Sequence, residues 1–132
     1  MMKDNKTAFK ESKLYELGIQ MLVKITKFTY NEIVLVTNEI FKYVYSIPQE
    51  ISINAIDTFI AKVSEQYKTD DVSNIFITLL VKEEVQIKFN LDPLDSIQDY
   101  MGWLYVYYIY SKAKCLSTEP MEKYLNKRLR ED

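Results

Sequence analysis

The chain has 132 residues, of which 48% are hydrophobic and 27% charged, and its formal net charge is −2. A chain of this length can bury a core without disulfide crosslinks, so we expect one domain over 1–132, with 1–13 loose or frayed. The near-neutral charge provides no general attraction to nucleic acid or to an anionic membrane, and the absence of histidine excludes catalysis by an imidazole base.

Helical periodicity begins near residue 14. Over 14–28 apolar side chains recur every three or four residues, which predicts a mostly buried helix. Apolar residues of 19–25 also recur at every second position, as in a strand, and we prefer the helix.

Thr29 followed by Glu32 has the pattern of a capping box. It predicts a second helix from residue 30, which Pro48 would end near residue 46.

The third predicted helix has the clearest amphipathic pattern. Ser52 is its expected N-cap, and apolar residues then recur at helical spacing as far as Tyr67. A polar break at 68–71 precedes a fourth helix that would end near residue 88. Apolar residues of 85–91 alternate as in a strand, but no second strand is available to pair with them. We therefore interpret 85–90 as the end of the helix or as an extended link.

Asp92 and Pro93 mark the start of the fifth predicted helix. Asp92 suits the N-cap position, Pro93 suits the first helical position, and Asp95 complements the helix dipole. The helix would continue through the uncharged segment 100–110, which holds five of the eleven tyrosines and the single tryptophan. Gly102 lies inside this helix, and we expect a neighbouring helix to approach closely there.

The predicted fold is therefore all-α, a single compact bundle of five or six helices around the aromatic helix. The expected helices span about 14–28, 30–46, 52–67, 71–88, 93–114 and 118–130. The expected core face of the aromatic helix consists of Tyr100, Trp103, Leu104, Tyr107 and Ser111.

The aromatic helix is apolar or aromatic on every side. Such a helix must be enclosed by its own chain, by a second copy or by a partner. Tyrosine is common at interfaces because its large ring carries a hydroxyl group. We favour an internal position, and a partly exposed position that binds a partner is the alternative. The candidate interface residues are Tyr100, Met101, Trp103, Tyr105, Tyr107, Tyr108 and Tyr110.

The last helix is locally basic. Between residues 112 and 130 there are six positive and two negative side chains. The candidates for contact with phosphate groups are Lys123, Lys127, Arg128 and Arg130. The run is short and is followed by Glu131 and Asp132, so a solvated helix face explains it as well. We do not expect nucleic acid to be the main partner.

Few residue types remain that could support catalysis. Cys115 is the only cysteine, which excludes an internal disulfide and a thiolate zinc site, and two glycines cannot form a phosphate loop. Asp92, Asp95 and Asp99 are spaced to share one helix face and could hold Mg²⁺ or Ca²⁺. Helix capping explains the first two equally well, so we expect no metal and no other cofactor.

These features predict a non-catalytic protein–protein interaction module that acts through the aromatic helix. We expect it to bind another protein or itself, as a homo-oligomer. The chain is rich in residues with AT-rich codons, which favours a phage-type accessory protein, either an assembly or structural component or an inhibitor of a host or defence protein. The alternatives are a nucleic-acid-associated protein that uses the basic last helix and a metal-dependent enzyme that uses the three aspartates.

The expected location is the cytoplasm, or the host cytoplasm if a phage encodes the protein. No signal-peptide pattern opens the chain, and a lone cysteine fits a reducing compartment. The apolar segment 101–110 is shorter than the roughly 20 residues that a helix needs to cross a bilayer.

Overall fold

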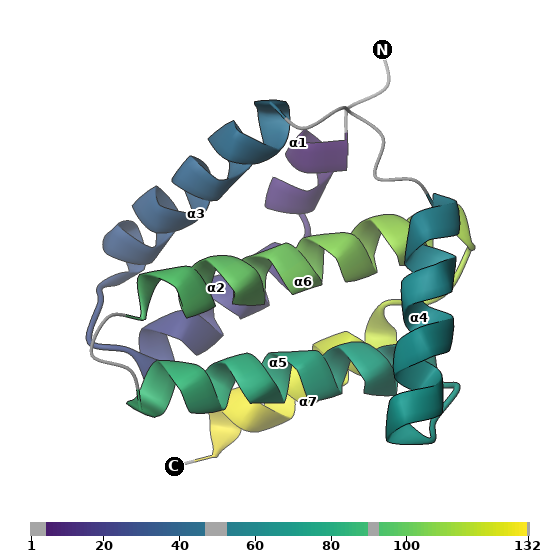
Figure 1. The fold of residues 1–132 in the computed structure, drawn as a ribbon. Helices are drawn as coiled ribbons and strands as arrows, with labels where there is room; N and C mark the ends of the chain where they lie inside the picture. The colour runs from purple at the N-terminus through teal and green to yellow at the C-terminus, as the bar shows by residue number, and fades with distance from the viewer. Residues whose placement is uncertain (1–4, 47–52, 90–92, 132) are drawn as a thin grey trace.

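The computed structural model describes residues 5–46, 53–89 and 93–131, and the regular structure in these ranges is entirely helical. The seven helices of the described ranges pack together (Figure 1). They are α1 (Asn5–Lys10), α2 (Lys13–Ile25), α3 (Tyr30–Ser46), α4 (Ile53–Tyr67), α5 (Val72–Phe89), α6 (Leu94–Ala113) and α7 (Glu119–Arg130).

The all-α prediction is confirmed, and two uncertain segments are helical. The segment 19–25 lies within α2, and α5 continues as a helix to Phe89, so within the described residues neither alternating pattern forms a strand. The capping box at the start of α3 is also present. The backbone N–H of Glu32 donates to Thr29 Oγ1 at 3.2 Å, and the backbone N–H of Thr29 donates to Glu32 Oε1 at 3.0 Å. The hydrogen bond that the Glu32 carboxylate accepts from the Thr29 backbone, together with the Thr29 side chain, lowers the pKa of Glu32.

The structure differs from the prediction at the start of the chain, where we expected a loose segment. Residues 5–10 form α1, and the side chain of Phe9 is fully buried. Its ring lies 5.5 Å from that of Tyr15 on α2 and 5.3 Å from that of Tyr105 on α6. A single phenylalanine among polar residues has no periodicity, so the sequence pattern did not reveal this helix.

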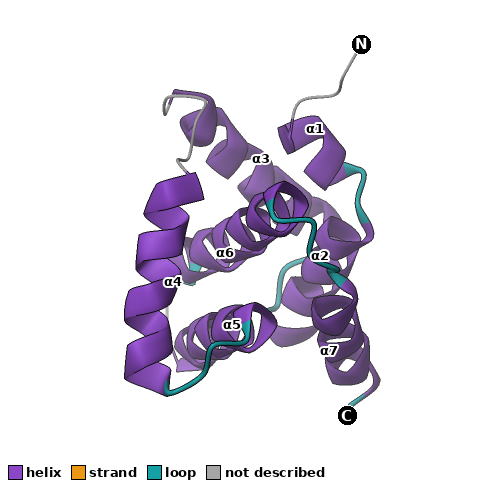
Figure 2. Ribbon diagram, turned by 90° about the vertical axis from the view of Figure 1, so that its right-hand side faces the viewer, coloured by secondary structure: helices purple, strands orange, loops and turns teal. Residues whose placement is uncertain are grey.

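The helices form layers around the pair α5 and α6. These two helices pack side by side and run in opposite directions (Figure 1). Figure 2 looks nearly along this pair, and shows α4 on one side with α2 and α7 on the other. Helix α4 crosses the end of the pair where α5 begins and α6 ends (Figure 1).

Most of α6 is enclosed by the protein's own chain. It contacts α1, α2, α3, α4 and α5. Tyr100, Leu104, Tyr107 and Ser111 of the expected core face are buried, whereas Trp103 is only half-buried. Burial extends well beyond the expected face. The complete set of buried α6 residues is Ser96, Ile97, Tyr100, Met101, Leu104, Tyr105, Tyr107, Ile109, Tyr110 and Ser111.

The close approach to a glycine occurs at Gly18, and the expectation that it occurs at Gly102 is wrong. A Cβ atom built on Gly18 would lie 2.6 Å from Leu104 Cδ1 and 3.0 Å from Met101 Sδ, where α2 packs on α6. A Cβ atom built on Gly102 would have no neighbour within 4 Å. The glycine that permits tight helix packing is therefore in α2.

Alanine substitutions at the two glycines should have opposite effects. Gly102→Ala should stabilise the protein by about 0.5–1 kcal/mol, because alanine restricts the unfolded chain and favours the helix. Gly18→Ala should destabilise it by about 1–2 kcal/mol, because Leu104 and Met101 are fully buried and have little space to move. Urea denaturation of the two variants and the wild type measures both changes. Equal effects at the two positions would contradict this packing.

Candidate protein-binding surface

The aromatic residues predicted to form an interface are largely inaccessible. Five of the seven are buried, namely Tyr100, Met101, Tyr105, Tyr107 and Tyr110. Three of the tyrosine hydroxyls are used within the chain. Tyr100 Oη donates to Glu84 Oε1 at 3.5 Å, Tyr110 Oη donates to Asp57 Oδ1 at 2.5 Å, and Tyr107 Oη lies 2.8 Å from Ser73 Oγ. These five side chains therefore contribute to the core and present no binding surface in this structure.

The other two candidates, Trp103 and Tyr108, are half-buried against neighbouring helices. The ring of Trp103 stacks on Phe59 of α4 with a centroid distance of 5.4 Å and an interplanar angle of 12°. The ring of Tyr108 lies 5.4 Å from that of Phe9 on α1. Both rings thus attach a peripheral helix to α6, which leaves only part of each exposed.

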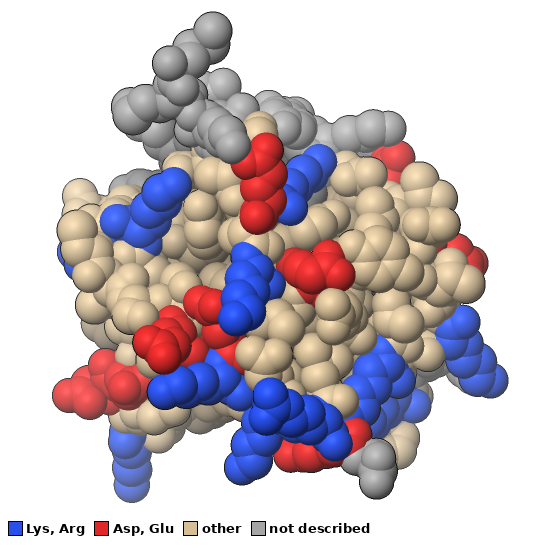
Figure 3. Space-filling view, turned by 180° about the vertical axis from the view of Figure 1, so that it is seen from behind, with Lys and Arg blue, Asp and Glu red and all other residues tan. Residues whose placement is uncertain are grey.

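The four basic residues predicted to contact phosphate have different environments. Arg128 Nη2 lies 3.0 Å from Glu84 Oε2 of α5, and its Nη1 lies 3.3 Å from Glu131 Oε2. Lys123 pairs with Glu119 at 3.6 Å on the helix surface. Lys127 and Arg130 are exposed. Figure 3 shows the molecule from behind, where acidic side chains lie among the lysine and arginine side chains. Of the four, Arg128 has a structural role, because it neutralises a carboxylate that is almost completely buried.

Glu84 is the centre of a buried polar cluster that joins α5, α6 and α7. Its side chain accepts hydrogen bonds from Tyr100 of α6 and from Tyr124 and Arg128 of α7. Burial raises the pKa of Glu84, and the positive charges of Arg128 and Lys88 oppose the increase. Burial and the neighbouring carboxylate also raise the pKa of Tyr124 to about 12. These hydrogen bonds connect α5, α6 and α7, so the cluster acts as a structural junction of three helices.

The three aspartates predicted as a metal site are only partly described, because Asp92 lies outside the described residues. Helix α6 begins at Leu94, with Pro93 in the N-cap position and no side-chain capping hydrogen bond. Burial raises the pKa of Asp99, and the negative charge of Asp95 raises it further. Within the described ranges, no three acidic or cysteine side chains are grouped as metal ligands would be.

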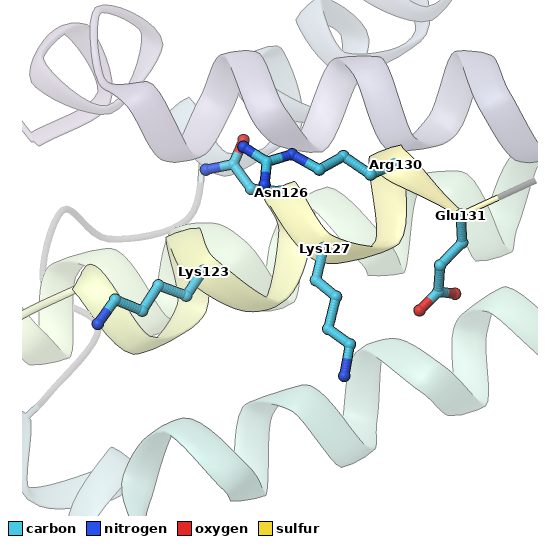
Figure 4. Close-up of a pocket in the computed structure, with 5 residues that line it drawn as sticks. All are labelled: Lys123, Asn126, Lys127, Arg130 and Glu131. Carbon is cyan, nitrogen blue, oxygen red and sulfur yellow. The ribbon is translucent and has the colours of Figure 1, made fainter.

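One cavity lies along α7, and its charged groups do not converge. It has a volume of about 430 Å³ and is lined by Lys123, Asn126, Lys127, Arg130 and Glu131. Figure 4 shows that the side chains of Lys127 and Glu131 leave one side of the helix, whereas those of Asn126 and Arg130 leave the other. A catalytic site needs its groups directed at one reacting atom, and this arrangement does not provide that.

Among the described residues, α5 carries a row of exposed apolar side chains. Val81, Val85 and Phe89 are 41%, 48% and 85% exposed, and they follow one another at intervals of four residues. We call these three residues the α5 stripe. They occupy the half of the helix that α4 does not cross (Figure 1). The remaining large exposed apolar residues are Tyr30, Leu35, Tyr67, Leu94 and Leu116, which belong to other elements of the chain. Within the part of the chain that the structure describes, the α5 stripe is the one place where three of these residues follow one another at intervals of four on a single helix.

The sequence pattern did not identify the α5 stripe, although its three residues recur at intervals of four. Helix α5 also carries apolar residues on the opposite side, where Ile75, Phe76, Leu79, Leu80 and Ile87 are buried. With apolar residues on both sides, periodicity alone does not identify the covered side. The interval of four residues among Val81, Val85 and Phe89 was the available signal, and the alternation of 85–91 obscured it.

Comparisons with known proteins provide no family assignment. The chain matches no protein-family model, no curated protein and no solved structure. Within the part of the chain that the structure describes, no helix combines the length and the apolar character needed to cross a bilayer.

Acidification should stabilise the wild-type protein relative to a Glu84→Gln variant. The pKa of Glu84 is higher in the folded chain than its ordinary value of 4.5, so the folded state binds the proton more tightly. The stability difference should therefore shift in favour of the wild type as the pH falls from neutrality through the raised pKa to 4.5. Urea unfolding of both proteins across this pH range measures the shift. A difference that is constant with pH would contradict the raised pKa.

Alanine substitution of Arg128 should destabilise the protein much more than alanine substitution of Lys127, because only Arg128 has a structural role. Arg128→Ala should destabilise the protein by about 2–4 kcal/mol, because the buried Glu84 carboxylate loses its neutralising partner. Lys127→Ala should change stability by about 0.5 kcal/mol or less, because Lys127 is exposed. Thermal and urea unfolding report both values, and a similar loss at both positions would refute this division.

Proposed function

We propose that the protein is a non-catalytic protein–protein interaction module that binds its partner through the α5 stripe. The observation that carries this proposal is the exposure of Val81, Val85 and Phe89 in one line on a helix whose opposite side is core. Contiguous exposed apolar surface of this kind favours a binding role over a purely structural one.

The α5 stripe supplies the centre of an interface and requires a surrounding contact area. Full burial of one valine or phenylalanine side chain contributes about 1.5–3 kcal/mol. Since Val81 and Val85 are already half-buried, the three side chains together contribute roughly 3–5 kcal/mol on binding. Association also costs translational and rotational freedom, so the partner must contact the neighbouring surface as well. Phe89 is the natural anchor because it is the largest and the most exposed of the three.

The shifted pKa values of three tyrosines support a non-catalytic role for these side chains. Tyrosine is one of the few residue types left for acid–base chemistry in a chain without histidine. The hydrogen bond to Asp57 raises the pKa of Tyr110 to about 12, and the hydrogen bond to Glu16 does the same for Tyr30. Burial raises the pKa of Tyr100 well above its ordinary value. These shifts move the pKa values of the three tyrosines further from the range useful near neutral pH.

Within this class, a phage-type accessory protein is the form that we propose, acting in assembly or as an inhibitor of a host or defence protein. The support is the AT-rich codon preference of the composition, with its abundance of lysine, isoleucine and tyrosine. The partner is another protein or a second copy of the chain. The interaction surface moves from α6, where the sequence placed it, to α5.

Charge substitution in the α5 stripe should abolish partner binding without unfolding the protein. We expect Val85→Glu and Phe89→Glu to change the melting temperature little, because Val85 is 48% and Phe89 85% exposed and glutamate is compatible with a helix. Affinity capture from cells that naturally produce the protein, with quantitative mass spectrometry, compares each variant with the wild type. Proteins retained by the wild type should be lost from both variants.

Leu35→Glu is the matched control for these variants. Leu35 is 65% exposed and lies on α3, away from the α5 stripe. This variant should retain the proteins captured by the wild type. Capture that is unaffected by Phe89→Glu, or lost equally with Leu35→Glu, would refute the proposed binding surface. Light scattering after size-exclusion chromatography determines in parallel whether the partner is a second copy.

A further inference from the structure

We infer that the partner presents an amphipathic helix whose apolar residues are bordered by aspartate or glutamate. This inference rests on the proposed function and adds the chemistry of the partner. Two features of the surface carry it: the linear form of the α5 stripe and the lysines that border it.

The form of the α5 stripe matches a helix. Residues at intervals of four form a ridge along a helix surface, and such ridges pack into the grooves of a second helix. From Val81 to Phe89 the ridge is about 12 Å long, at 1.5 Å per residue. Helix α4 already packs across the other half of the α5–α6 pair. A partner helix on the α5 stripe would cover the half of α5 that α4 leaves open.

Lysines border the α5 stripe on both sides. At about 100° per residue, the α5 stripe spans roughly 80° around the helix axis. Lys82 lies about 20° beyond Phe89, and Lys88 lies about 20° outside Val81. Both lysines are exposed. The adjacent acidic residue Glu83 lies about 200° from Val81, on the side of α5 that faces away from the α5 stripe.

Helix α7 adds a third lysine on the side of Lys88. Glu84 faces α7 through its contact with Arg128, and the charge of Lys88 acts on the same carboxylate. Lys127 precedes Arg128 on α7, and Figure 4 shows its side chain directed to the side of the helix where α5 lies. We call Lys82, Lys88 and Lys127 the lysine border.

The lysine border favours an acidic partner helix over the other possible occupants. A second copy docked by the same surface would bring its own lysine border close to the first, and like charges at an interface oppose binding. A membrane surface would bind better to several large side chains, whereas two of the three residues in the α5 stripe are valines. Acidic side chains on a partner helix would complement the lysines and make binding weaker at high salt.

A display selection of helical peptides tests the inference directly. The library keeps a fixed apolar stripe and varies the bordering positions among glutamate, glutamine and lysine. The wild-type protein should enrich glutamate at these positions. A Lys82→Glu, Lys88→Glu, Lys127→Glu triple variant should enrich lysine instead. The affinity of the best acidic peptide for the triple variant should be roughly tenfold lower than for the wild type.

The matched control is a triple variant with the same change in charge on other elements, Lys27→Glu, Lys62→Glu and Lys68→Glu. These lysines are exposed and lie outside the α5 stripe, so the control should select the same acidic peptides as the wild type. Melting temperatures of both triple variants establish that they are folded. Loss of charge selectivity in the control as well would overturn the assignment to the lysine border.

The remaining outcomes separate this inference from the proposed function. Peptides that bind without charge preference, but are lost with Phe89→Glu, would overturn the acidic partner and retain the binding surface. Peptide binding that is unaffected by Phe89→Glu would overturn both. If no peptide is enriched, the inference fails. In that case, Phe89-dependent binding to vesicles of phosphatidylserine and phosphatidylcholine would identify a membrane surface, and Phe89-dependent self-association would identify a second copy.

Discussion

The enclosure of α6 is the constraint on which the rest of the structure depends. The segment 100–110 of this helix has no charged residue, so its own chain must cover most of that surface, and α1, α2, α3, α4 and α5 all contact the helix. Its tyrosine hydroxyls need hydrogen-bond partners after burial, since an unpaired buried hydroxyl is costly. Asp57 of α4 and Glu84 of α5 are two of those partners. The tyrosines therefore fill the core and also form hydrogen bonds with polar residues of the surrounding helices.

The same constraint explains why an exposed apolar surface remains on α5. Helix α5 is also apolar on more than one side, and its contacts with α6 and α7 use the side that carries Phe76, Leu80 and Glu84. Helix α4 covers one end of the α5–α6 pair, where Phe59 stacks on Trp103. The other half of α5 receives no such cover, so Val81, Val85 and Phe89 stay exposed. A partner helix would cover the α5 stripe in the way that α4 covers the opposite end of the α5–α6 pair.

Some charged side chains of this protein form ion pairs that hold helices together, and others are exposed to solvent. Arg128 and Glu84 form an ion pair that is largely withdrawn from water, where loss of one partner leaves an uncompensated charge. Lys82, Lys88 and Lys127 are exposed and can be neutralised by a partner at little cost. The basic character of the last helix thus has two origins. Arg128 pairs with Glu84 and so holds α7 against α5. Lys127 is exposed and belongs to the lysine border beside the α5 stripe.

Local signals in the sequence determined the helical class, the approximate helix positions and the capping box of Thr29 and Glu32, because periodicity and capping depend on residues a few positions apart. Tertiary structure decided the rest. The burial of Phe9, the tight contact at Gly18 and the exposure of the α5 stripe all depend on helices distant in the chain. When a helix is apolar on two sides, its own sequence does not show which side the neighbouring helices will cover. Burial belongs to pairs of packed elements, so only the assembled fold could distinguish the core tyrosines of α6 from the open surface of α5.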